Sequence, residues 1–158
     1  MKHRNWIFLS GFIWFSIGLW LLYKGLRLIS EAVIQPGSLS VKLEPVFGNA
    51  QQAGAFLVGI GLLVGLLKGR FVLIKTVRKV VSRICSLPLP IRLKDAYSRS
   101  YWILLGSMFA LGMAFRFLPL PVDVRGTIDV AIGSALIQGA LFYFKEAIYG
   151  TGFPAQSR

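Results

Sequence analysis

The chain is poor in the residues from which most active and metal sites are built. Its 158 residues include six acidic side chains, one histidine and one cysteine. Cys85 has no partner for an internal disulfide, and with His3 as the only histidine the usual zinc sites of His and Cys cannot form. The patterns HExxH and GxSxG and a phosphate-binding glycine loop are also missing. The sequence therefore disfavours an enzyme and predicts no metal or cofactor.

Charged residues of any kind are also scarce. They make up 15% of the chain, whereas hydrophobic residues make up 55% and the mean hydropathy is +0.65. A soluble domain carries about 25% charged residues, so the composition predicts a membrane protein. The net charge of +12 lies beside apolar runs rather than across a soluble face. This placement favours the bilayer and its anionic lipid headgroups as partners, and not nucleic acid.

Four apolar runs have the length of transmembrane helices. They cover residues 6–23, 50–67, 101–118 and 127–144. At about 1.5 Å per residue, each run just crosses a hydrocarbon layer of about 30 Å. The first run is longer than the roughly 7 to 15 apolar residues of a secretory signal, so we expect a retained helix.

Two segments lack these long apolar runs. Residues 30–49 contain Pro36-Gly37, a favoured turn pair, and we expect an external loop, with a small hairpin or a re-entrant cap as alternatives. The tail over 148–158 is expected to be loose.

A basic segment in the middle of the chain sets the predicted topology. Residues 68–99 hold nine of the eighteen Lys and Arg residues against one acid, Asp95. Lys and Arg are retained on the cytoplasmic side during insertion. Two spans on each side of this segment then place both termini in the cytoplasm, with thirteen cations inside and five outside. We expect a multi-pass protein of the inner cell membrane.

Residues 70–86 have the pattern of an amphipathic helix. Ile74, Val77 and Val81 follow helical spacing, and cations fall on the opposite face. We expect this helix to lie in the headgroup layer; the alternative is that it continues the second span and packs on the protein. The predicted lipid contacts are Lys75, Arg78, Lys79 and Arg83.

Small residues recur every four positions in the predicted spans. Such rows bring helix backbones together in lipid. We interpret them as packing faces within one chain, with self-association into a homo-oligomer as the alternative. The rows are Gly61, Gly65 and Gly69; Gly106, Ala110 and Ala114; and Ala131, Ala135 and Gly139. On the first span Gly11, Gly18 and Gly25 recur every seven residues.

The charged residues near the outer ends of the third and fourth spans are the main candidate site. They are Arg116, Asp123, Arg125 and Asp129. Asp129 lies four residues after Arg125, so the two can pair on one helix face. Counting along the helices also gives Arg116 and Asp129 the same depth, where opposite charges should pair. The cluster is interpreted either as a structural clamp or as an ion or proton site.

Polar residues deeper in the spans are few. They are Ser16, Ser107, Ser134 and Gln138, and we expect Gln138 to hydrogen-bond across helices. So few groups cannot line a path for a charged solute within one subunit. The sequence thus predicts an all-α integral membrane protein of four transmembrane helices, with one basic amphipathic helix between the second and third. It slightly favours an oligomeric transporter or channel subunit over a non-transporting protein that binds anionic lipid or a partner through the basic helix.

Overall fold

The computed structural model describes residues 3–86, 106, 110, 113–114 and 117–149. These residues form an all-helical structure with three helices long and apolar enough to cross a membrane. The long helices are α1 (His3–Ala32), α4 (Ala50–Lys68) and α8 (Val122–Tyr149). Most of the predicted span over 101–118 and most of the tail lie outside the described residues.

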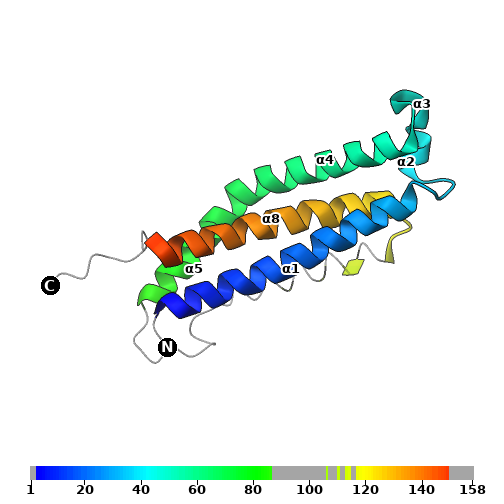
Figure 1. Cartoon of the computed structure of the whole chain (residues 1–158). Helices are drawn as coiled ribbons and strands as arrows, with labels where there is room; N and C mark the ends of the chain where they lie inside the picture. The colour runs from blue at the N-terminus through cyan, green and yellow to red at the C-terminus, as the bar shows by residue number, and fades with distance from the viewer. Residues whose placement is uncertain (1–2, 87–105, 107–109, 111–112, 115–116, 150–158) are drawn as a thin grey trace.

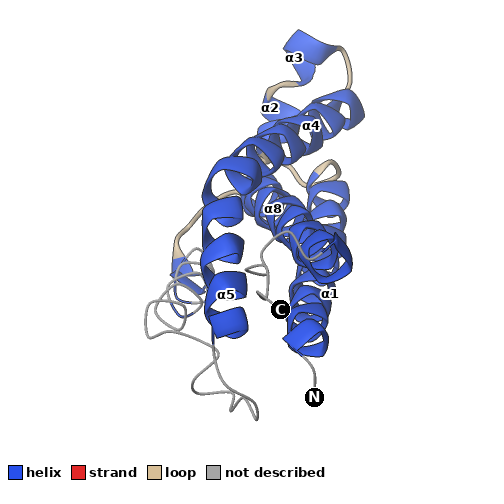
Figure 2. Cartoon of the chain, turned by 90° about the vertical axis from the view of Figure 1, so that its left-hand side faces the viewer, coloured by secondary structure: helices blue, strands red, loops and turns tan. Residues whose placement is uncertain are grey.

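α8 lies between α1 and α4 (Figures 1 and 2). Glycines of α1 bring that helix into backbone contact with α8: a Cβ on Gly18 would stand 2.9 Å from the carbonyl oxygen of Gly133, and one on Gly25 would stand 2.7 Å from that of Gly126. Later residues of α1 thus meet earlier residues of α8, so these two helices are antiparallel. The seven-residue glycine spacing on α1 produces this contact, because it keeps one strip of the helix free of side chains.

The glycine row of α4 faces the other side of α8. A Cβ on Gly61 would stand 2.9 Å from the carbonyl oxygen of Thr127, and one on Gly65 would overlap the Ser134 side chain. α4 and α8 therefore run parallel, and this small-residue row is occupied by packing within the chain. Gly59 lies on another face of α4, where an added Cβ would meet none of the described residues within 4 Å.

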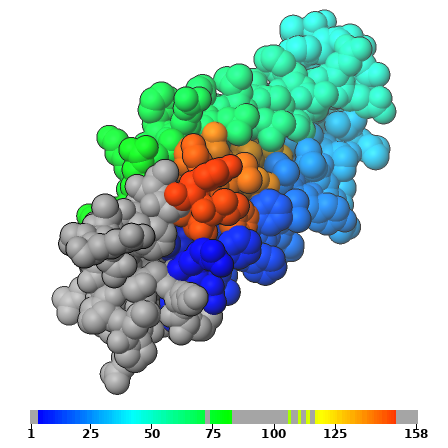
Figure 3. Space-filling view, turned by 60° about the vertical axis from the view of Figure 1, so that its left-hand side comes forward, coloured from blue at the N-terminus to red at the C-terminus, as the bar shows by residue number. Residues whose placement is uncertain are grey.

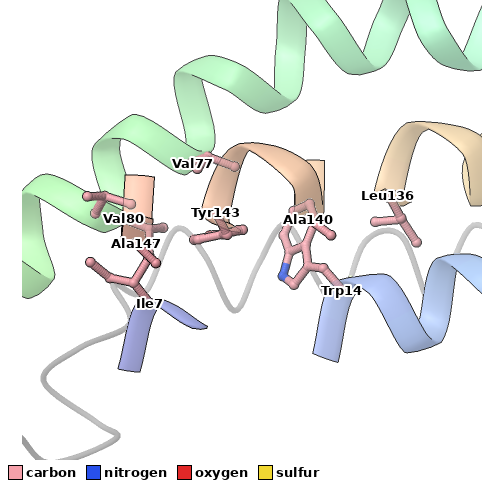
Figure 4. Packing of buried hydrophobic residues seen from close by; sticks show 9 residues of the cluster. Ile7, Trp14, Val77, Val80, Leu136, Ala140, Tyr143 and Ala147 are labelled. Atoms are coloured by element: carbon pink, nitrogen blue, oxygen red, sulfur yellow. The ribbon is translucent and has the colours of Figure 1, made fainter. Parts of the chain in front are cut away.

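The described ends of the chain lie at the same end of the bundle (Figure 1), which we call the terminal end. A hydrophobic core cluster joins α1, α5 and α8 there (Figure 4). Its aromatic members, Trp14 and Tyr143, have ring centroids 5.7 Å apart. The other buried members are Ile7, Val77, Val80, Val81, Leu136, Ala140 and Ala147.

The opposite end of the bundle, the loop end, contains two short helices, α2 (Leu39–Lys42) and α3 (Glu44–Phe47). The predicted loop over 30–49 is therefore partly helical. Ser38 caps α2 by accepting from the Val41 N–H, and Asn49 caps α4 by accepting from the Gln51 N–H. Gly48 between them adopts a left-handed conformation (φ 77°), which glycine takes without strain. These local signals turn the chain back into the second long helix.

The basic segment continues the second long helix. A π-helical turn, η1 (Gly69–Leu73), connects α4 to α5 (Ile74–Ser86) without a break. Val77, Val80 and Val81 of α5 are buried on the core cluster, whereas Lys75, Arg78 and Lys79 are exposed. Val77 and Val81, which we expected in the headgroup layer, are covered by protein together with Val80, because α5 packs on α1 and α8. This packing corresponds to the alternative in which the segment continues the second span.

Candidate functional site

Asp123 is the most deeply buried charged residue at the loop end. Its side chain is fully buried, and its Oδ2 accepts hydrogen bonds from the backbone N–H of Ser40 at 2.6 Å and from the Ser40 hydroxyl at 3.1 Å. Oδ1 accepts from the Val124 N–H at 3.0 Å. A carboxylate in the first turn of a helix is also favoured by the helix dipole. Asp123 therefore joins the first turn of α8 to α2 in the loop.

Asp129 forms an ion pair with α1. Its Oδ2 lies 2.9 Å from Lys24 Nζ, and the two side chains are 16% and 48% exposed, respectively. Lys24 also lies over the Trp20 ring, 5.9 Å from its centroid. Lys24 was not among the predicted partners, because depth was counted only along the third and fourth spans. The same count along the first span places Lys24 about 27 Å from the inner end, against about 22 Å for Asp129, so depth alone does not pair them.

Arg125 makes a different contact from the one we expected. Its guanidinium donates to the carbonyl oxygen of Leu118 at 2.6 Å, and its buried Nε has no hydrogen-bond partner among the described residues. Asp129 faces α1 and pairs with Lys24, so the expected pair between Arg125 and Asp129 is replaced by two separate contacts. Arg116, and with it the expected pair of Arg116 and Asp129, lies outside the described residues.

The polar residues in the middle of the spans make few contacts between helices. Ser16 is exposed, and the buried Ser134 hydroxyl donates to the carbonyl oxygen of Ala131 in its own helix at 3.1 Å. Gln138 lies against Gly69, where η1 begins, and its buried Oε1 has no hydrogen-bond partner in the part of the chain that the structure describes. Within that part, this oxygen does not make the hydrogen bond across helices that we expected. Ser107 lies outside the described residues.

The predicted packing residues lie in different surroundings. Gly69 of η1 faces Ala135, and Gly65 of α4 faces the carbonyl of Ala131, so these residues lie where α4 and η1 contact α8. Gly139 is buried in α8. Gly106, Ala110 and Ala114 are exposed within the described part of the chain, and a Cβ on Gly106 would meet nothing there within 4 Å.

Exposed cations follow one another from the last residue of α4 through η1 into α5, and we call this set the basic strip: Lys68, Arg70, Lys75, Arg78 and Lys79. All five side chains are exposed, and the sequence has no acid between Glu44 and Asp95. Arg83, the fourth predicted lipid contact, lies farther along α5. A run of exposed cations with no acid in its own segment is suited to bind anions.

Metal binding finds no support in residues 3–86 and the described positions beyond them. No group of three or more His, Cys, Asp or Glu side chains there could hold a metal ion.

Comparison with known proteins identifies no family. No protein-family model matches the chain, and neither the curated proteins nor the solved structures gave a match. Helix packing and the basic strip are therefore the features from which a function can be inferred.

Proposed function

We propose that this protein is a four-span membrane protein that binds anionic lipid on the cytoplasmic side through its basic strip and does not transport a solute. The observation that carries the proposal is the two-sided character of α5. Val77, Val80 and Val81 attach one face to the bundle, and Lys75, Arg78 and Lys79 are exposed on the other. A helix held in this way presents its cations at the bundle surface, where lipid phosphates would lie.

The ends of the described segments support the proposed topology. α5 ends near the start of α1 and the end of α8, whereas α8 begins at the loop end (Figure 1). A fourth span between α5 and α8 would join these two ends of the bundle. The apolar run over 101–118 has the length for that crossing. With this fourth span the basic strip and both termini are cytoplasmic, as the distribution of Lys and Arg predicts.

Helix packing argues against a solute path between the described spans. The glycines of α1 and α4 approach α8 to backbone contact, as at Gly18 with Gly133 and at Gly61 with Thr127. Contacts this close leave no room for a hydrated solute between those helices. Ser134, the buried serine of α8, is also bonded within its own helix, so it offers no lining group.

Transport by an oligomer is the second candidate function, and the ion pair of Lys24 with Asp129 is the observation that favours it. Ionisable residues within spans are costly and often belong to ion or proton paths. Asp129→Asn would separate the two roles in reconstituted vesicles. A proton site predicts loss of pH-dependent flux in a protein of unchanged stability, whereas a clamp predicts lower stability and no specific effect on flux.

The lipid proposal is tested with the full chain in vesicles that contain phosphatidylglycerol and phosphatidylcholine. The measured quantity is the preference of spin-labelled phosphatidylglycerol over phosphatidylcholine at the protein surface. The variant K75Q/R78Q/K79Q should bring this preference towards equality, because each cation near an anionic surface contributes about 1 kcal/mol. Raising the salt concentration should have the same effect on the native protein, since screening shortens the range of the attraction.

A charge-preserving variant provides the matched control. K75R/R78K/K79R keeps all three charges and should keep the lipid preference of the native chain. Two results would contradict the proposal: equal preference in the neutral and charge-preserving variants, or flux of an ion or small solute in vesicles that contain the native protein.

A further inference from the structure

A cavity of about 330 Å³ lies at the terminal end, between the start of α1 and the end of α8. Figure 3 shows these two segments side by side on this face of the molecule. The lining residues are Arg4, Asn5 and Phe8 from α1 and Ala147 and Ile148 from α8. We propose that this cavity binds one anionic phospholipid, with its phosphate at Arg4 and Asn5 and its acyl region along Phe8.

The polar side of the cavity is suited to a phosphate. Arg4 is the only charged residue among the described lining residues, so no acid among them competes for it. A guanidinium can donate two parallel hydrogen bonds to a phosphate, and the amide of Asn5 supplies a further donor beside it. This combination favours an anionic headgroup over a zwitterionic one, because a second cation in the ligand would meet Arg4.

The apolar side of the cavity is suited to a lipid rather than a free anion. Phe8 is 50% exposed and packs on Phe144, with ring centroids 5.0 Å apart. Phe12, one helical turn farther along the same face of α1, is 58% exposed. Together with Ile148, which is also exposed, these rings form an apolar strip that leads away from Arg4. A free phosphate would leave this strip unused, whereas an acyl chain would cover it.

The walls of the cavity are held in place by the protein core. Ile7 precedes Phe8 and is fully buried, and Ala147 belongs to the same core cluster. A site formed by two packed helices needs little ordering when a ligand binds, which lowers the entropic cost of binding. The described lining residues come from α1 and α8, so the cavity is separate from the basic strip on α4, η1 and α5. This proposal rests on the proposed function in one respect, which is that the terminal end of the bundle lies in a headgroup layer.

Native mass spectrometry of the full chain in detergent tests the proposal. Phosphatidylglycerol, phosphatidylcholine and inorganic phosphate are added in separate titrations. We expect the native protein to retain one phosphatidylglycerol in preference to phosphatidylcholine. Arg4→Gln should weaken this binding about tenfold, the loss expected when one charge-assisted hydrogen bond is removed. Lys145→Gln is the matched control, because Lys145 is an exposed cation near the same end that does not line the cavity.

Two further measurements separate binding at this site from changes in folding and from general charge attraction. Phe8→Leu should weaken the binding of phosphatidylglycerol without changing that of inorganic phosphate, and thermal unfolding of each variant reports on folding. The proposal is overturned if Arg4→Gln binds phosphatidylglycerol as well as Lys145→Gln does, or if inorganic phosphate displaces the lipid at equal concentration. K75Q/R78Q/K79Q should leave this retained lipid in place, so failure of the basic strip and failure of the cavity give different results.

Discussion

Asp123, at the start of α8, receives two hydrogen bonds from a single residue, Ser40, which lies 83 positions earlier in the chain. Both residues are fully buried. The contact attaches the short helix α2 to the first turn of α8, so the loop between the first two long helices is held by the third described one. A buried carboxylate with several donors is a strong constraint, because water cannot replace a lost partner.

Removal of this carboxylate should destabilise the loop end. Asp123→Ala leaves the Ser40 N–H and hydroxyl without their acceptor, and we expect a loss of about 3 kcal/mol in the free energy of unfolding. Ser40→Ala removes only the hydroxyl contact and should cost about 1 kcal/mol. Ser30→Ala is the control, since the exposed Ser30 hydroxyl bonds to its own helix. Denaturant titration in micelles measures the free energy of unfolding of all three variants. Equal stability of the Asp123 and Ser30 variants would show that the contact of Asp123 with Ser40 does not stabilise the loop end.

Two glycines of α4 should respond in opposite ways to the same substitution. Gly65→Ala places a methyl group against the Ser134 side chain and the Ala131 carbonyl, so we expect a loss of about 1 to 3 kcal/mol from overpacking. Gly59→Ala meets open space among the described residues and should stabilise α4 by up to about 1 kcal/mol through better helix propensity. Thermal unfolding of the two variants provides the comparison. Similar effects at both positions would mean that α4 does not pack on α8 through the glycine row.

The ion pair of Lys24 with Asp129 should contribute modestly to stability. Because the Lys24 side chain is 48% exposed, we expect a coupling energy of about 0.2 to 1 kcal/mol in a double-mutant cycle of Lys24→Gln and Asp129→Asn. The double variant should then be more stable than the sum of the single changes implies. The free energy of unfolding of the four proteins gives this energy directly. A coupling energy of zero would show that the two charges do not stabilise each other.

The Gln138 side chain should be replaceable by an apolar one. Its Oε1 is buried without a hydrogen-bond partner among the residues described, so Gln138→Leu removes an unsatisfied oxygen and should raise the free energy of unfolding by about 1 kcal/mol. Ser134→Ala is the comparison, because the Ser134 hydroxyl already has a partner and its removal should give no gain. A clear loss of stability in Gln138→Leu would indicate that the amide is bonded in the membrane.

The helical structure, the apolar helices long enough to cross a membrane, and the glycine rows of α1 and α4 that contact α8 were predictable from the residues alone. Apolar length and small-residue spacing are local properties, and they are visible along a single helix without knowledge of its neighbours. The row of Gly61, Gly65 and Gly69 was recognised in this way, and its contact with α8 follows from the missing side chains.

Which helix faces which row, and which charges meet, depends instead on the folded arrangement. Lys24 and Asp129 are 105 positions apart, and Ser40 and Asp123 are 83 apart, so no spacing rule connects them. The contact of Lys24 with Asp129 depends on the register between the antiparallel helices α1 and α8, which the glycine contacts set. The contact of Ser40 with Asp123 depends on the turn that places α2 beside the start of α8. The position of α5 was also decided only by the folded arrangement, because a basic amphipathic pattern is equally compatible with a lipid surface and with a protein core.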